Sequence, residues 1–123
     1  MAFEFTEDQP IYRQLRNHMA GAIIKGSLKE GDALPSVRTV AVDFNVNPLT
    51  ASKAYQELVG EELVEKRRGL GMYIVEGARN KLLEAEQKQF LENEWPAIIK
   101  RIHSLELDDS KLLESLSNKK DGK

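Results

Sequence analysis

The fold is decided by residues 36–58, which read SVRTVAVDFNVNPLTASKAYQEL. Ser36 is a residue type that caps helix N-termini, and the apolar residues after it recur on one side of a helix. Asparagine and proline in residues 45–48 favour a turn, and a second run of helical period follows them. We therefore expect two short helices, over residues 37–44 and 48–61, joined by a turn, which is the order of a helix-turn-helix.

The segment before this pair predicts a further helix over about residues 10–25. Pro10 suits its start, because proline lacks the amide hydrogen that would be unpaired there. Gly26 is a residue type that ends helices. Upstream, Phe3 and Phe5 are separated by one polar residue, which indicates a short strand or an arm docked on the core.

The segment after the pair predicts a β-hairpin. Residues 63–68 and 72–75 have the composition of strands, and Gly69 and Gly71 between them allow a tight reversal. Three helices followed by a hairpin give the order of a winged helix-turn-helix. We therefore expect a mainly α fold with a small β-hairpin, in which residues 1–77 form a winged helix-turn-helix DNA-binding domain.

Residues 78–118 return to a helical period and predict a short two-helix C-terminal segment. Over about residues 79–105, apolar residues follow alternating steps of four and three, the seam of a packed or coiled helix pair. Pro96 falls inside this run and should kink or restart the helix, because proline clashes with the preceding turn. A break at residues 107–110, with an N-cap aspartate, precedes the last helix, and residues 119–123 are expected to be disordered.

An apolar seam on an isolated helix cannot be buried within one protomer, except in part by the last helix. A second copy of the chain is therefore the expected partner, and the segment is expected to dimerise. Packing of this segment onto its own winged helix is the alternative. The predicted dimerisation residues are Leu91, Trp95, Ile98, Ile102, Leu105, Leu112, Leu113 and Leu116.

Composition limits the class of protein and its location. A chain of 123 residues is too short for two full domains. The absence of cysteine excludes disulfides and thiolate metal sites, and is typical of a reducing compartment such as the cytoplasm. No stretch approaches the ~18 consecutive apolar residues of a spanning helix, and the N-terminus lacks the regions of a signal peptide. We therefore expect a soluble, unprocessed protein with no membrane partner.

Net charge gives no general indication of a nucleic-acid partner, because it is -2. Residues 1–77 hold 9 basic and 11 acidic side chains, so even this part is not basic overall. Four of the acidic residues cluster at the far end of the second helix of the pair and the start of the hairpin: Glu57, Glu61, Glu62 and Glu65. We expect this cluster to lie away from any DNA-binding edge, and general affinity for DNA to be weak.

Three motifs occur in the order and at the spacing of one family of bacterial regulators. They are GDALPSVRTVA over residues 31–41, VNPLTASKAYQEL over residues 46–58 and LVEKRRGLGMYI over residues 63–74. On these motifs the first 77 residues resemble the GntR family of transcription regulators. The Asn47-Pro48 start of a helix and the short two-helix tail resemble the YtrA subfamily in particular, in which the two C-terminal helices mainly dimerise.

Two positions depart from the pattern of this family. The family usually has glycine just before the first strand, where this chain has Glu62, so the preceding helix end is expected to be shifted or strained. The subfamily often has a polar residue at the position of Leu49. A leucine leaves only an apolar contact there, such as one with a thymine methyl group.

The resemblance and the residue types together predict where DNA would bind. Arg38 resembles the arginine that the family directs at operator DNA, and its planar fork suits a guanine or a phosphate. Ser36 would donate to a phosphate at a helix N-terminus, or only cap its helix. Arg68 beside Gly69 would enter the minor groove, unless this strand edge is merely solvated. The predicted DNA-binding residues are Ser36, Arg38, Thr39, Asn47, Leu49, Thr50, Ser52, Lys53, Arg68, Gly69 and Gly71.

These features predict a sequence-specific transcriptional regulator, a homodimeric repressor of its own or a neighbouring transporter operon. Two protomers would read palindromic half-sites of double-stranded operator DNA. A winged helix used only for protein-protein interaction is the alternative, which the balanced charge favours. An enzyme, a cofactor and a metal site are not expected, because neither His18 nor His103 lies at metal-site spacing from carboxylates. The sequence leaves any effector open.

Overall fold

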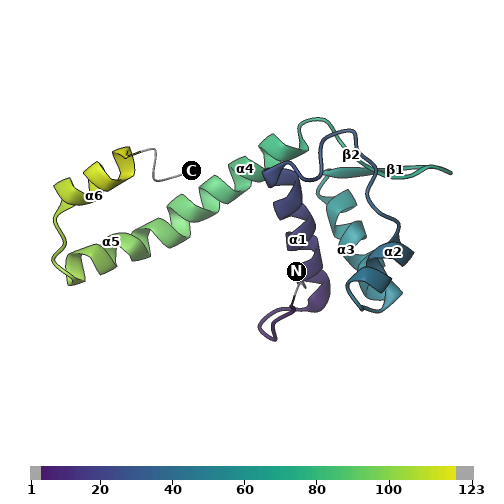
Figure 1. Cartoon of the computed structure of the whole chain (residues 1–123), viewed down its shortest axis with the longest axis horizontal. Helices are drawn as coiled ribbons and strands as arrows, with labels where there is room; N and C mark the ends of the chain where they lie inside the picture. The colour runs from purple at the N-terminus through teal and green to yellow at the C-terminus, as the bar shows by residue number, and fades with distance from the viewer. Residues whose placement is uncertain (1–3, 119–123) are drawn as a thin grey trace. The chain divides into compact units, whose positions relative to one another are not determined.

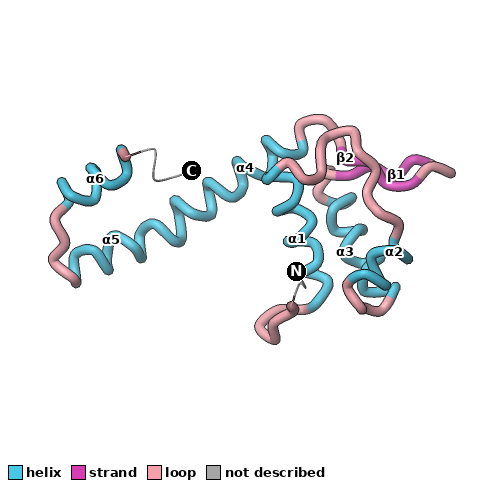
Figure 2. Tube along the Cα trace, in the orientation of Figure 1, coloured by secondary structure: helices cyan, strands magenta, loops and turns pink. Residues whose placement is uncertain are grey.

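The structure is a computed structural model that describes residues 4–118. The chain divides into two compact units, with the boundary between Ala85 and Glu86. We call the first the reader unit and the second the tail unit, and Figures 1 and 2 show the elements of each. Phe3 and the segment 119–123, for which disorder was predicted, lie outside the described residues.

The reader unit contains three helices, a hairpin and the start of a fourth helix. Its elements are α1 (Ile11–Lys25), α2 (Val37–Asp43), α3 (Pro48–Gly60), β1 (Val64–Arg67), β2 (Gly71–Ile74) and the first turns of α4 (Ala78–Gln89). The strands pair antiparallel, with Val64 opposite Ile74. The mainly α fold with a small hairpin and the winged helix-turn-helix order are confirmed.

The core of the reader unit lies mainly between α1 and α3. Leu15 and Ile23 of α1 and Tyr55 and Leu58 of α3 are buried, and Ile74 of the hairpin closes the cluster. Removing side chains of this size from water contributes roughly 1.5–3 kcal/mol each. Tyr55 and Leu58 therefore form part of the core face of α3.

A buried glutamine holds the N-terminal segment on α1. The side-chain amide of Gln14 donates to the carbonyl oxygens of Thr6 at 2.9 Å and Gln9 at 2.8 Å. Its Oε1 accepts from the backbone N–H of Thr6 at 2.8 Å. Phe5 packs against the core, so the segment forms a docked arm, and residues 4–10 contain no strand.

The loop that precedes α2, residues 31–36, pairs with the hairpin. Ala33 forms an isolated antiparallel bridge with Tyr73, and the N–H of Leu34 donates to the carbonyl of Met72 at 2.8 Å. The loop thus lies along the free edge of β2 and holds the residues before α2 against the wing. Its glycine, aspartate and proline are typical of turns, so the sequence alone gave no sign of this pairing.

The end of α3 contains the strain expected at Glu62, and the helix end is not shifted. Glu62 has a φ of 62°, a left-handed conformation that costs a residue other than glycine about 1–2 kcal/mol. Its N–H donates to the carbonyl of Val59 at 2.9 Å, and the N–H of Leu63 donates to that of Leu58 at 3.0 Å. These two bonds form a Schellman C-cap, which requires the left-handed residue at this place.

The reader unit extends beyond residue 77, where the sequence predicted its end. Ala78 and Leu82 of α4 are buried in its core. Because burial of apolar side chains ties them to this core, the first two turns of α4 belong to the reader unit.

The tail unit is helical and interrupted near its proline. Its elements after α4 are the π-helix η1 (Phe90–Glu94), α5 (Trp95–Ser104) and α6 (Asp109–Ser117). Pro96 has no amide hydrogen to donate to the preceding turn, and a π turn is one way in which a helix accommodates such a defect. The predicted interruption is therefore confirmed as a π turn. The N-cap aspartate is Asp108, whose Oδ1 accepts from the N–H of Ser110 at 2.9 Å.

Candidate nucleic-acid interface

The N-terminus of α2 presents hydroxyl groups and a free cation to solvent. Ser36 is its N-cap: Oγ accepts from the N–H of Thr39 at 3.1 Å, and the Ser36 hydroxyl donates to Thr39 Oγ1 at 3.0 Å. Arg38 is exposed in the first turn, and within residues 4–118 its guanidinium makes no hydrogen bond or ion pair. An unpaired guanidinium beside a helix N-terminus is suited to a phosphate or a guanine edge.

Tyr55 connects α3 to this helix start. Its ring is only 1% exposed, and its hydroxyl donates to the carbonyl of Pro35 at 2.6 Å. Burial raises the pKa of the Tyr55 phenol, so the hydroxyl remains a donor at any physiological pH. Tyr55 is therefore a core residue with a bonded hydroxyl. The bond also fixes the residue before the Ser36 cap, a role that the sequence did not reveal.

The N-terminus of α3 presents a capped turn with an apolar side chain at its tip. Asn47 Oδ1 accepts from the N–H of Leu49 at 2.7 Å, so Asn47 is the N-cap. Leu49 is 78% exposed. Thr50 and Ser52 are half-buried, with Ser52 beside Lys53 on the solvent side of the helix. The predicted α3 residues therefore lie at the exposed start of this helix, where a groove-reading helix carries its contacts.

Lys53 has a partner that the sequence did not indicate. Its Nζ lies 4.2 Å from the centroid of the Tyr12 ring on α1. A cation over an aromatic face is attracted by the ring electrons and is worth about 0.5–1 kcal/mol at an exposed site. Tyr12 therefore orients the Lys53 ammonium while it stays accessible to solvent.

The wing separates its three cations. Arg67 Nε donates to Glu65 Oε2 at 2.9 Å, and its guanidinium lies 4.1 Å from the Tyr73 ring centroid. In the described part of the chain neither Lys66 nor Arg68 has such a partner. Arg67 is thus engaged within the hairpin, and Lys66 and Arg68 are not. At the tip, Gly69 and Gly71 have φ of 76° and 119°, and they flank Leu70, which is 68% exposed and which sequence reasoning did not single out.

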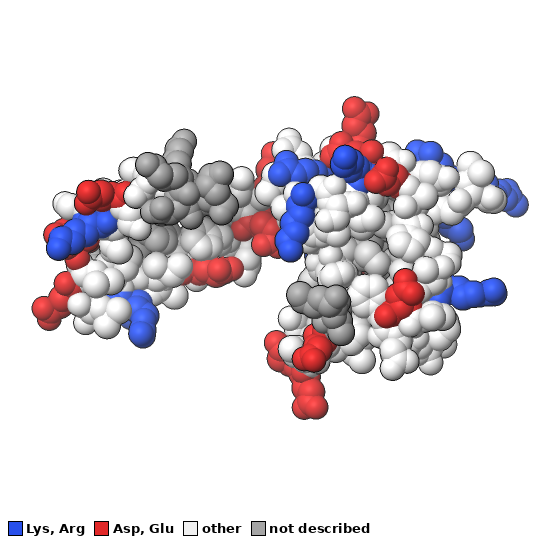
Figure 3. Space-filling view, viewed as in Figure 1, with Lys and Arg blue, Asp and Glu red and all other residues white. Residues whose placement is uncertain are grey.

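Ion pairs within the reader unit explain why its net charge gives no indication of DNA binding. Arg13 NH1 lies 3.1 Å from Glu57 Oε1, and Arg16 pairs with Glu61, so two cations of α1 neutralise the acidic end of α3. The cations at the start of α2 and at the wing tip keep their charge. In Figure 3 basic side chains project from the edge of the reader unit where α2 and the wing lie. The predicted division between an acidic end and a basic edge is present.

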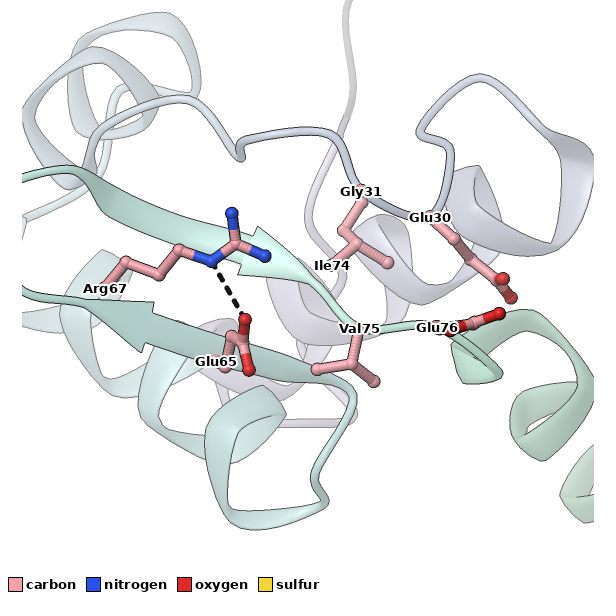
Figure 4. A pocket seen from close by; sticks show the side chains of 7 residues that line it. All are labelled: Glu30, Gly31, Glu65, Arg67, Ile74, Val75 and Glu76. Atoms are coloured by element: carbon pink, nitrogen blue, oxygen red, sulfur yellow. Dashed lines mark hydrogen bonds and ion pairs between the residues drawn. The ribbon is translucent and has the colours of Figure 1, made fainter.

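A cavity under the base of the wing has the wrong charge for DNA. It measures about 560 Å³, and the carboxylates of Glu30, Glu65 and Glu76 line it beside Arg67. Figure 4 shows Arg67 turned toward Glu65, while Glu30 and Glu76 lie at the other end. Carboxylates repel phosphate groups, so this cavity is no part of the candidate interface. Residues 4–118 contain no group of three His, Asp or Glu side chains that could hold a metal ion.

The tail unit has no buried residue among those described, and it contains an apolar groove. The groove lies between α5 and α6 and measures about 330 Å³. Five predicted dimerisation residues line it together with Ile99, and a sixth, Ile98, is exposed on α5. The five are Trp95, Ile102, Leu112, Leu113 and Leu116.

The π turn changes the face that the sequence assigned. Phe90 stacks on Trp95, with ring centroids 6.3 Å apart, and Leu91, which the sequence paired with Trp95, is more exposed than either ring. Residues five apart do not share a face of an α-helix, so an α-helical pattern could not pair these two rings. Leu105 lies just beyond α5, at its C-cap. The sequence could have predicted Ile99 as a residue of this apolar face, because it follows Trp95 by four residues and precedes Ile102 by three.

A winged helix-turn-helix with two exposed helix N-termini and a basic wing defines a DNA-binding protein of the transcription-regulator class. Comparison with known proteins gives the family. Residues 9–74 match the family of bacterial regulatory proteins described as the gntR family. The chain belongs to the GntR family, whose members are DNA-binding transcriptional regulators and not enzymes.

Individual relatives agree with this membership. The chain is 45% identical over 83 residues to the HTH-type transcriptional repressor YtrA of Bacillus subtilis (strain 168), a match that covers 68% of this chain and 64% of YtrA. It is 31% identical over 121 residues to the uncharacterized HTH-type regulator YhcF of the same organism, covering 97% of each. A GntR family transcriptional regulator from Listeria monocytogenes has a similar structure, with a TM-score of 0.74 and 32% identity over 91% of this chain and 96% of that one.

No helix within residues 4–118 is both long enough and apolar enough to cross a membrane.

Proposed function

We propose that the protein is a homodimeric repressor that binds palindromic operator DNA, with one reader unit on each half-site. The observation that carries the dimer is the tail unit, in which no described residue is buried although both helices carry apolar side chains. Leu113 and Leu116 of α6 are 63% and 75% exposed. Contiguous exposed apolar surface marks an interface, and a second copy offers a matching face.

The aromatic pair and the apolar groove supply the contacts of this proposed interface. The rings of Phe90 and Trp95 are stacked but still partly exposed, so a partner can cover them without rearrangement. Burying a large side chain such as Trp95 contributes about 1.5–3 kcal/mol. The proposed dimerisation residues are Phe90, Leu91, Trp95, Ile98, Ile99, Ile102, Leu105, Leu112, Leu113 and Leu116.

The proposed DNA contacts divide into cations, caps and an apolar contact. Arg38, Lys53 and Arg68 supply charge to phosphates and base edges, because their charges are not neutralised by carboxylates of residues 4–118. Leu49 contacts a thymine methyl group in the major groove. The remaining residues position the helix starts and the wing backbone on the phosphates: Ser36, Thr39, Asn47, Thr50, Ser52, Gly69 and Gly71.

The proposed target is an operator that controls its own or a neighbouring transporter operon, read in the cytoplasm. The similarity to YtrA, a protein described as a repressor, supports repression. The GntR membership supports an operator as the ligand.

A titration of labelled DNA tests this function. The full chain is mixed with overlapping duplexes from the region upstream of its own gene, at about 50 and 200 mM salt. We expect one duplex to bind more tightly than a shuffled duplex of the same composition, and its affinity to fall at the higher salt, because neutralised phosphates release counterions. Equal affinity for all duplexes, or affinity independent of salt, would contradict sequence-specific DNA binding.

A further inference from the structure

The first turns of α4 meet the ends of two other helices in the reader unit. Arg79 Nε donates to the carbonyl of Ile24, in the last turn of α1, at 2.8 Å. Lys81 Nζ donates to the carbonyl of Glu61, the C-cap residue of α3, at 2.8 Å. Both carbonyls belong to helix ends, where no intrahelical N–H remains to bond them.

A third side chain holds the start of α4 from the opposite direction. Glu30 follows α1, and its Oε2 accepts from the backbone N–H of Arg79 at 3.1 Å. Backbone N–H groups of Gly77 and then Arg79 lower the pKa of the Glu30 carboxyl, so it is ionised at neutral pH. Glu30 thus caps the N-terminus of α4, and the side chain of Arg79 bonds to the end of α1.

Each of these contacts pairs a helix end with the charge that its dipole favours. The C-terminal ends of α1 and α3 carry partial negative charge and receive a guanidinium and an ammonium, whereas the N-terminus of α4 receives a carboxylate. Ala78 and Leu82 bury the same two turns in the core. The three polar contacts add further points of attachment to this apolar anchoring.

We propose that Glu30, Arg79 and Lys81 are positioning residues that fix α4 to the ends of α1 and the recognition helix α3, and that they thereby select the spacing between the two operator half-sites. The inference rests on the proposed homodimer. The N-terminal end of α3 reads DNA in that proposal, and Lys81 holds its C-terminal end. The bounds of α4 are Ala78–Gln89, so the helix whose start these contacts hold continues past the boundary at Ala85.

The test uses the full chain and a set of duplexes with different half-site spacing. Two half-sites of the operator are kept, and the spacing is changed by one, two or five base pairs. For the native protein we expect affinity to fall at each altered spacing. For the double variant Arg79→Gln/Lys81→Gln we expect the ratio of affinities between the native spacing and a two-base-pair insertion to fall by about tenfold, because a loosened joint tolerates other geometries.

Controls separate this role from loss of charge or of fold. Lys88→Gln removes one charge from the same helix, at a residue without a side-chain partner in the described structure. It is the control for the single variants Arg79→Gln and Lys81→Gln, and it should keep the native ratio of affinities between the two spacings. Affinity for a duplex with one half-site should be unchanged in all variants. If the double variant unfolds, Glu30→Gln, which removes only the carboxylate, should lower the ratio in the same direction. Arg79→Lys, which keeps the charge, should lower the ratio less than Arg79→Gln does.

The outcomes distinguish the two proposals. A spacing preference that is native in Arg79→Gln/Lys81→Gln and in Glu30→Gln overturns the positioning role and leaves the repressor proposal intact. A native protein that binds single and paired half-sites equally contradicts the homodimeric operator complex, and the positioning role falls with it.

Discussion

The two units of this chain differ in whether they bury their own apolar side chains. The reader unit closes its own core: every buried residue of the described chain, from Gln14 to Leu82, lies in it. The described part of the tail unit has no core of its own, because the groove between α5 and α6 is open and leucines such as Leu116 are exposed. A GntR reader unit is thus complete as a fold, whereas the tail leaves its apolar side chains exposed, and in the proposed dimer a second copy covers them. The comparison predicts that mutations in the tail change assembly and mutations in the reader change stability or DNA contacts.

The largest effect is expected from a charge in the apolar groove. Ile102→Asp would bury an unpaired carboxylate in the proposed interface, which costs several kcal/mol. We expect dissociation of the dimer and a loss of operator affinity of about 100-fold or more. Sedimentation equilibrium and a DNA titration measure the two effects. Lys100→Asp on the same helix, outside the groove lining, should leave both unchanged. A stable dimer of Ile102→Asp would show that the tail groove is not the interface.

Loss of the free cation on α2 should affect DNA binding alone. Arg38→Ala should weaken operator binding by about 1–3 kcal/mol, because a bidentate arginine contact is worth that much. Its melting temperature and dimerisation should be native, since the side chain is exposed and has no partner within residues 4–118. Lys25→Ala, at the C-terminal end of α1, is the matched control and should bind nearly as the native chain does. Unfolding of Arg38→Ala would show that this residue has a structural role.

Removal of one hydroxyl should weaken both fold and binding. Tyr55→Phe leaves the carbonyl of Pro35 without its tyrosine donor, and the net contribution of such a hydrogen bond is about 0.5–1.5 kcal/mol. Urea denaturation should show that loss in the free energy of unfolding. Operator affinity should also fall, because the start of α2 is less firmly held. Native stability of this variant would mean that water replaces the tyrosine at no cost.

Relief of strain should stabilise the reader unit. Glu62→Gly removes the steric cost of φ 62°, offset in part by the greater freedom of glycine in the unfolded chain. We expect a net gain of about 0.5–1 kcal/mol, seen as a higher thermal midpoint with dimerisation unchanged. The ion pair that is lost, Lys81 Nζ to Glu62 Oε1 at 3.9 Å on an exposed side chain, is worth little. A lower midpoint would contradict this assignment of strain.

The smallest effect is a pH dependence from Glu30. Its pKa is lower in the folded chain, so its stabilisation is present above the ordinary glutamate pKa and is lost as pH falls through the lower folded value. The melting temperatures of the native chain and of Glu30→Gln should therefore differ near pH 7 and converge as the pH falls below the ordinary glutamate pKa. A difference that is constant over this range would show that the carboxylate charge contributes nothing.

Much of the reader unit could be predicted because its elements are local. Pro48 and Gly26 set helix limits, and α1, α2 and α3 have ends within one residue of those expected from apolar period. The caps Ser36 and Asn47 follow from residue type at a helix start. The turn glycines of the wing follow in the same way.

The contacts that position the candidate site could not be predicted, because they join residues far apart in the chain. Nothing near Ala33 indicates a bridge to Tyr73, and nothing near Arg79 indicates the carbonyl of Ile24. The π turn before Pro96 could not be predicted from the apolar period either, because that period assumes the same number of residues in every turn. A helical period therefore predicts which residues share a face of the helix only as far as the π turn.

The stoichiometry of the operator complex tests the central claim most directly. The full chain is titrated into a duplex that carries the paired half-sites, and the mass of the complex is measured by sedimentation equilibrium. Two reader units joined through their tails predict two chains per duplex, formed in one step, with no accumulation of a complex of one chain. A complex that contains one chain per duplex at every protein concentration would contradict the account.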